Sequence, residues 1–261
     1  MKGNIILYVI LFCLTLGCQS QNGEAVLLHE KDLQLVEIYD KYNENRHDYG
    51  SKKGEARDTI LNRFKETLLK TLSRDKAISF PFDSLSNTIK VIASKDKKLR
   101  IFSWDELNGG SWHIYNSAFQ YDAEGKTHSG ILSLNDSVND ELLHYTDVIH
   151  FEIEDVDKGL YLVKGYGTHG SGKDFYVYRL LSFEKGKVAD CSSCFDGEDR
   201  LVFIKPRGDK VSPKYNKEKK EITYLEMKPS FHDGEETGFE RPTGKVLKLK
   251  YKEGAFIKLD N

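Results

Sequence analysis

The sequence predicts an α+β protein in which two N-terminal helices precede an antiparallel β meander, built as a curled sheet or a sandwich. Apolar residues recur at helical spacing before about residue 80, and apolar and polar residues alternate after about residue 87. The connections between strand candidates are mostly short and polar, which argues against parallel crossovers. With 261 residues, of which 39% are hydrophobic, the chain is long enough to bury a sizeable core.

The first residues, MKGNIILYVILFCLTLGC, carry an export signal. Lys2 precedes an apolar run from Ile5 to Leu16, too short for a stable bilayer span but typical of a signal-peptide core. The run ends at Gly17-Cys18, which resembles the lipobox of bacterial lipoproteins. That resemblance implies that residues 1–17 are a signal peptide and that Cys18 carries lipid such as palmitate. Residues 18–24 then form a tether. An ordinary cleaved secretory signal and an uncleaved anchor are the alternatives.

Two helices are expected next. In residues 25–45 the apolar positions lie at helical spacing with charges between them, and residues 46–54 form a polar break. A second helix follows at about 55–73, with an apolar stripe that includes Phe64 and Leu68. Pro81 is expected to close this helical segment, which we place at residues 25–80.

Residues 81–261 are expected to form an antiparallel β domain of nine or ten strands, in one globular unit with residues 25–80. The clearest strand is 245–252, where Leu247, Leu249 and Tyr251 alternate with lysines, as on a sheet with one buried face. The other candidates are TIKVIAS, LRIFSW, WHIYNSAFQY, a strand near 127–134, DVIHFEIE, LYLVKGY, FYVYRLLSF, RLVFIK, EITYLEM and AFIKL.

Composition narrows the classes of function. The chain has 39 Lys+Arg and 41 Asp+Glu, whereas nucleic-acid binders usually carry a basic excess. We therefore expect no nucleic-acid partner. The R-G-D tripeptide at 207–209 is better interpreted as part of a solvated loop than as an adhesive motif.

Cysteine usage fits an exported protein. Cys13 leaves with the signal, Cys18 takes the lipid, and Cys191 and Cys194 remain as a C-S-S-C pair. A local disulfide suits an oxidising compartment. A free dithiol, a metal site completed by histidine and a thioredoxin-like redox pair are the alternatives.

The segment SWDELNGGSWHIY at 103–115 is the first candidate site. Asp105 and His113 are candidates for an acid–base pair, and Trp104 and Trp112 for a stacking platform for sugar rings or other flat ligands. The alternative is a structural hairpin. The segment looks like stretches of uncharacterised exported bacterial proteins, and this resemblance implies no activity.

The second candidate, GTHGSGKD at 167–174, has the glycine and lysine spacing of a phosphate-binding P-loop. Asp174 stands where that motif needs Ser or Thr, and a strand pattern follows instead of a helix. We therefore expect a glycine-rich hairpin loop, with His169 and Lys173 as ligand-binding candidates and no nucleotide. Four predicted strands separate this loop from the first one. In a meander that even number returns both loops to the same end of the sheet.

The remaining signals for catalysis are weak. The eight histidines form no metal motif, and His144 and His150, beside a strand start, are expected to make local hydrogen bonds. No G-x-S-x-G elbow is present, so the catalytic residues are unknown and no cofactor or metal is expected.

Three classes of function remain. The first is a lipid-anchored, non-enzymatic protein of the cell envelope, extracytoplasmic on the periplasmic or surface face, which binds a glycan, a peptide or an envelope protein. The second is an envelope hydrolase of glycan or peptide, and the third is an assembly subunit. Shared placement of the two loops, with an aspartate close to a histidine, would favour the enzyme.

Overall fold

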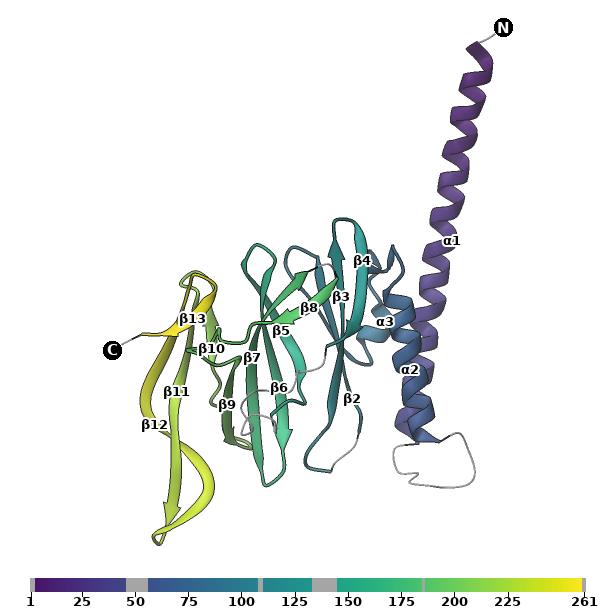
Figure 1. Cartoon of the computed structure of the whole chain (residues 1–261). Coiled ribbons are helices and arrows are strands. Elements are labelled where there is room, and N and C mark those ends of the chain that lie inside the picture. Colours follow the sequence, from purple (N-terminus) through teal and green to yellow (C-terminus); the bar gives the residue numbers. More distant parts are fainter. Residues whose placement is uncertain (1–2, 46–55, 108–109, 133–144, 185, 260–261) are drawn as a thin grey trace. The chain divides into compact units, whose positions relative to one another are not determined.

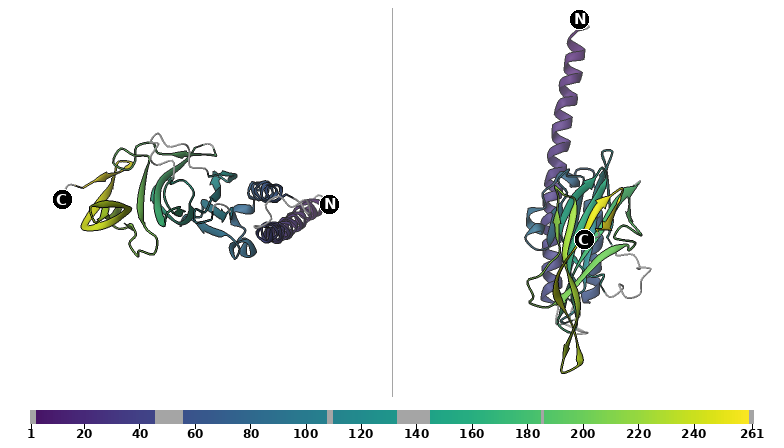
Figure 2. Two further views of the ribbon diagram at one scale, coloured as in Figure 1. Left: turned by 90° about the horizontal axis from the view of Figure 1, so that it is seen from below. Right: turned by 90° about the vertical axis from the view of Figure 1, so that its left-hand side faces the viewer.

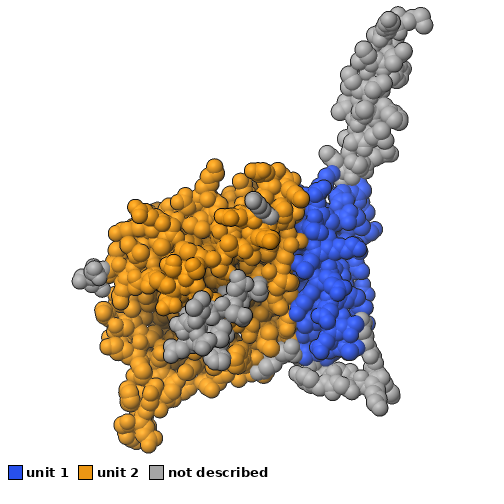
Figure 3. Space-filling view, viewed as in Figure 1, with its two compact units in different colours: residues 1–88 blue, residues 89–261 orange. Residues whose placement is uncertain are grey.

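The computed structural model describes residues 3–45, 56–107, 110–132, 145–184 and 186–259 (Figure 1). Side chains are described from residue 23 onward within the first helix, so the side chain of Cys18 lies outside the described part. The chain divides into two compact units, Met1–Thr88 and Ile89–Asn261 (Figure 3). Each unit is described by itself below.

The first unit is helical. α1 spans Gly3–Glu44 and α2 spans Arg57–Leu72; they are followed by a 3-10 turn, η1, at Ala77–Ser79 and by the short α3 at Asp83–Ser86. The α1 helix therefore begins well before residue 25, and the expected tether at 18–24 lies within it. The helical segment also continues past Pro81, because the buried Asp32 carboxylate accepts the Ser84 and Leu85 amides and so caps α3.

The contact between α1 and α2 follows the apolar stripes. Tyr39 of α1 packs on Phe64 of α2, with ring centroids 5.2 Å apart, and Phe64 is fully buried. Arg74, just after α2, pairs with Glu24 of α1 at 2.6 Å. The spacing seen in the sequence therefore places the apolar side chains of the two helices against one another.

The second unit is mainly antiparallel β and holds three sheets, where the sequence predicted a single meander. Sheet A has the order β1 (Lys90–Ala93), β2 (Leu99–Asp105), β3 (Tyr115–Ala123) and β4 (Lys126–Ile131). Sheet B contains β5 (Ile149–Asp157), β6 (Leu160–His169), β7 (Lys173–Glu184), β8 (Lys187–Asp190) and β9 (Arg200–Pro206). Sheet C contains β10 (Lys214–Asn216), β11 (Glu221–His232), β12 (Glu235–Lys252) and β13 (Ala255–Lys258).

Sheet B departs from a meander for a physical reason. The short β8 pairs only with Leu181–Glu184 of β7, which leaves the rest of that edge open. β9 fills the open edge, pairing with Lys173–Arg179 of the same strand. The thirteen strands of the described residues also exceed the nine or ten expected, because short strands such as β8 and β10 carry too few residues to show a period.

Sheet B is the middle layer of this unit (Figures 1 and 2). On one face, Tyr161, Val163 and Leu181 pack against Leu99, Ile101 and Phe119 of sheet A. On the other face, Leu162 and Leu180 join a cluster with Ile222, Leu249 and Phe256 of sheet C. Alternate side chains of β6 therefore enter different cores, as the two-residue period of a strand requires.

Cys191 and Cys194 form a disulfide in the connection between β8 and β9, with their Cα atoms 5.7 Å apart. The Cys194 carbonyl accepts the Phe256 amide, and the rings of Phe195 and Phe256 stack at 5.4 Å. The disulfide turn is thus held against β13 and does not stand alone.

Candidate functional site

The loop after β2 and the hairpin turn between β6 and β7 meet in the second unit. The rings of Trp112 and His169 lie 4.6 Å apart between centroids. The His113 amide donates to Thr168 Oγ1 at 3.0 Å. Trp112, His113 and His169 therefore lie at one place, formed by sheets A and B together.

The glycine-rich segment 167–174 has a structural explanation. It forms the end of β6, a turn and the start of β7, and no helix follows it. A Cβ at Gly167 would overlap the Phe175 ring and the Asp147 carbonyl. At the turn itself Ser171 and Gly172 have positive φ values of 63° and 73°. The glycines thus allow close packing and a tight turn.

Asp105 and His113 form a close pair. Asp105 Oδ2 lies 2.6 Å from His113 Nδ1, and the side chains are 20% and 41% exposed. The Tyr115 ring stacks on the imidazole at 5.6 Å with an interplanar angle of 10°. A carboxylate that orients a partly exposed imidazole is an arrangement able to move a proton to or from a ligand.

Arg207, directly after β9, connects the loops of the site. Its Nη2 donates to the carbonyl oxygens of Ser111, His169 and Lys173, and its Nε donates to Asp174 at 2.9 Å. Arg207 of the R-G-D tripeptide therefore holds the loop after β2 and the β6–β7 turn by hydrogen bonds to their backbone. Asp209, the last residue of the tripeptide, lies 3.4 Å from Arg241.

Asp174 is the buried anion of this cluster. Burial acts to raise its pKa, but hydrogen bonds from Arg207 and Tyr166 and the charge of Lys205 outweigh burial and hold the pKa below its usual value. The carboxylate is thus the counter-ion of Arg207 and Lys205. In a P-loop the same position would hold a magnesium-binding hydroxyl.

The predicted residues divide into two groups. Trp112, His113, His169 and Asp105 come together, whereas Trp104 is 1% exposed and belongs to the interior. Lys173 pairs with His169 across the hairpin and contributes its carbonyl to Arg207. Trp104 follows the buried Phe102 on the same face of β2, so strand alternation removes it from the site.

A row of rings extends the site beyond the predicted residues. Tyr145 lies 5.4 Å from His169 and 5.1 Å from Phe175. Burial, then the nearby Glu240 carboxylate, raise the pKa of Tyr145. Neither Tyr145 nor Arg207 was among the predicted site residues, because each is an isolated residue brought in from another loop.

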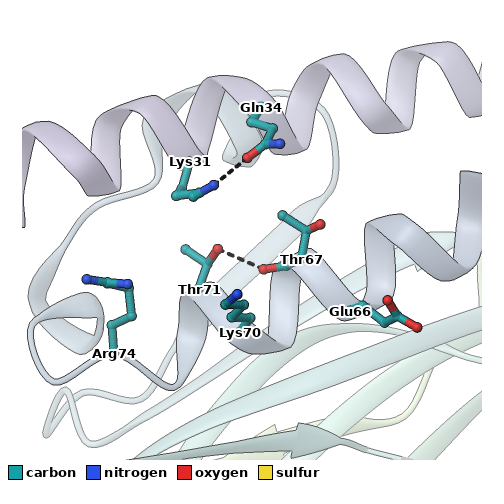
Figure 4. Close-up of a pocket in the computed structure, with 7 residues that line it drawn as sticks. All are labelled: Lys31, Gln34, Glu66, Thr67, Lys70, Thr71 and Arg74. Atoms are coloured by element: carbon teal, nitrogen blue, oxygen red, sulfur yellow. Dashed lines mark hydrogen bonds between the residues drawn. The ribbon is translucent and has the colours of Figure 1, made fainter.

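Metal ligands, membrane-spanning helices and other pockets were also sought among the described residues. The part of the chain with described side chains contains no group of three or more potential metal ligands, and none of its helices is long and apolar enough to cross a membrane. A groove of about 410 Å³ lies between α1 and α2, where Lys31 donates to Gln34 at 2.7 Å (Figure 4). Arg74 borders that groove and is already paired with Glu24.

Comparison of the chain with protein-family models, with curated proteins and with solved structures gave no significant match.

Proposed function

We propose that this protein is a lipid-anchored cell-envelope protein that binds a polar ligand with an apolar face. The binding site is the one built by Trp112, His113 and His169. The ligand is a glycan or a peptide of the envelope, or an exposed part of an envelope protein. No nucleotide or nucleic acid is part of this proposal.

Support for the anchor comes from the sequence. A short apolar run ends at Gly17-Cys18, and a lipidated Cys18 would hold the extracytoplasmic chain at the membrane. The formal charge of -2 is too small for strong recruitment to an anionic surface, so the lipid supplies the attachment.

The contact between Trp112 and His169 carries the proposal for the site. It joins two loops that are 57 positions apart in the chain (169 − 112) into one aromatic surface beside the Asp105–His113 pair. Aromatic faces next to fixed hydrogen-bonding groups suit a ligand that has a hydrophobic face and polar edges.

Substitution of Trp112 tests this proposal. Trp112→Ala is expected to weaken binding to a panel of envelope glycans and peptides by about tenfold, the loss of one aromatic contact of 1–2 kcal/mol. The matched control is Phe231→Ala, which removes an aromatic side chain that is 66% exposed on the β11–β12 hairpin. Equal binding by the two variants would contradict the proposal, provided that their melting temperatures agree.

A hydrolase is the second candidate, because Asp105 holds His113 at 2.6 Å. An imidazole oriented in this way can act as a general base on water. If it does, His113→Ala and Asp105→Asn would each lower hydrolysis of the bound glycan or peptide by about a hundredfold or more, with binding retained. Unchanged turnover in both variants would exclude this role.

A further inference from the structure

A small polar cavity adjoins the candidate site. It has a volume of about 150 Å³ and lies between β3 and the start of β5. It is lined by Tyr115, Asn116, Ser117, Leu132, Thr146, Asp147, Val148 and His150. It borders the aromatic surface, since Tyr115 stacks on His113 and the Trp112 indole acts on the Asp147 carboxyl.

Asp147 is the cavity residue with the least compensated charge. Burial, followed by the charge of Glu106, raises the pKa of the Asp147 carboxyl, and the Trp112 indole opposes this only in part. Of these two neighbours, Glu106 is an anion and the Trp112 indole is neutral, so neither brings a positive charge to Asp147. A cation placed beside Asp147 would therefore stabilise its ionised form.

Two arginines of the described residues around the site pair with other carboxylates. Arg207 pairs with Asp174 at 2.9 Å. Arg179, whose charge acts on His150, donates from Nε to Asp190 at 2.9 Å. Neither arginine pairs with Asp147, and the Glu106 carboxylate, which accepts a hydrogen bond from Asn116 at 3.2 Å, adds negative charge beside it.

His150 keeps the cavity free of an opposing charge. It is 2% exposed, and burial together with Arg179 lowers its pKa to about 3, so the imidazole is neutral at physiological pH. Its Nδ1 lies 3.0 Å from Ser117 Oγ on β3, and its Nε2 has no hydrogen-bond partner in the described part of the chain. The hydrogen bond of the His150 side chain, which was expected to be local, is therefore made from sheet B to sheet A. The other histidine of that prediction, His144, lies outside the described residues.

We propose that this cavity receives a primary ammonium group of the ligand, ion-paired with Asp147. This inference rests on the proposed binding function and names the chemistry that the site selects. A cavity of about 150 Å³ is large enough for a small polar group, since one water molecule takes about 30 Å³ of the liquid. It fits the amino-bearing end of an amino sugar or of a lysine-like side chain, while the rest of the ligand lies on Trp112 and His169.

Paired probes test the proposal on the mature protein by calorimetry. D-glucosamine is compared with D-glucose, and Nα-acetyl-lysine amide with Nα-acetyl-norleucine amide. At least one amine is expected to bind about tenfold or more tighter than its neutral partner, since a charge-assisted hydrogen bond contributes about 1.5–3 kcal/mol. The pair that shows the preference identifies the source of the ammonium group.

Variants locate the effect. Asp147→Asn is expected to remove the preference for the amine, so that the amine and its neutral partner bind equally. Glu106→Gln is expected to reduce the preference by a smaller factor. Glu184→Gln, which neutralises an exposed carboxylate at the far end of β7, is the matched control and should keep the full preference.

The outcomes separate the two claims. Equal binding of amine and neutral partners by the wild-type protein would overturn the ammonium site but leave the aromatic binding site standing. A preference that survives in Asp147→Asn would likewise overturn it. Absence of binding for all four probes, with no effect of Trp112→Ala on any envelope ligand, would contradict both proposals.

Discussion

At the scale of residues, the candidate site depends on charges that satisfy one another before any ligand arrives. Arg207 reaches three carbonyl groups and the Asp174 carboxylate. Asp174 is 4% exposed, and Lys205, at 6%, faces its other oxygen at 3.4 Å. These contacts fix the backbone on which Trp112 and His169 are carried.

Neutralising Asp174 tests this arrangement. The pKa of Asp174 is lowered in the folded state, so its stabilising contribution is complete above the unfolded pKa of about 3.9 and is lost as the pH falls through the folded pKa. Asp174→Asn is expected to lower the free energy of unfolding by about 3 kcal/mol at pH 7, because it leaves the buried Lys205 uncompensated.

Urea unfolding at pH 7 and at pH 3 gives the measurement. The difference between wild type and Asp174→Asn should shrink at pH 3, because this pH lies below the unfolded pKa and the contribution of the ionised carboxylate is no longer complete there. A difference of equal size at both pH values would show that the ionised carboxylate contributes nothing.

Part of this site could be predicted from the sequence. The Asp105–His113 pair was visible, because two groups eight positions apart flank a Gly-Gly turn. Trp104 was also predicted for the site but is 1% exposed, because both faces of β2 are buried from Leu99 to Trp104. Arg207 and Tyr145 were missed, because the chain separation between them and Trp112 is bridged only by the tertiary fold.

At the scale of elements, two glycines let strand β6 lie so close to its neighbours that a Cβ at either position would overlap them. Gly167 faces the Phe175 ring and the Asp147 carbonyl, and Gly165 faces Val148. The glycines of the P-loop-like segment therefore serve packing. The segment matches the glycine spacing of a P-loop by coincidence. Its glycines are needed for close packing and for a tight hairpin turn, and not for binding phosphate.

Alanine substitutions separate packing from turn flexibility. Gly167→Ala is expected to destabilise the protein by about 1–3 kcal/mol, as overpacking does. Gly170→Ala is the matched control, because no atom lies within 4 Å of a Cβ built there. Thermal melting of both variants makes the comparison, and equal melting temperatures would refute the packing explanation.

The disulfide turn between β8 and β9 should contribute little stability. The bridged cysteines are three positions apart, so the bridge removes little entropy from the unfolded chain, less than the roughly 3 kcal/mol of a fifteen-residue loop. The double variant Cys191→Ser, Cys194→Ser should unfold at a urea concentration close to that of wild type. A loss above about 3 kcal/mol would show that the bridge holds β13 in place.

At the scale of the whole molecule, three sheets replace the single meander that the sequence suggested. Alternation identified most strands, but it carries no information on which strands pair, so the placement of β9 beside β7 could not be foreseen. The two loops were expected together because four strands separate them. They do meet, although those strands belong to two sheets, β3 and β4 in sheet A and β5 and β6 in sheet B.

The proposed lipid anchor is also tested at the scale of the whole chain. Cys18→Ser is expected to abolish labelling with radioactive palmitate and to release the protein from the membrane fraction, because in our proposal a lipid on Cys18 supplies the attachment. Cys13→Ser is the control and should leave labelling unchanged. Retention of Cys18→Ser in the membrane fraction would contradict the lipoprotein assignment.

The central claim is that the loops around Trp112 and His169 form one binding site. Side-chain NMR spectra of the histidines, recorded during titration with a bound glycan or peptide, test it most directly. We expect the resonances of His113 and His169 to shift together with the same dissociation constant, while those of His232, which is 84% exposed on the β11–β12 hairpin, stay unchanged. A ligand that shifts only one of the two, or neither, would contradict the shared site.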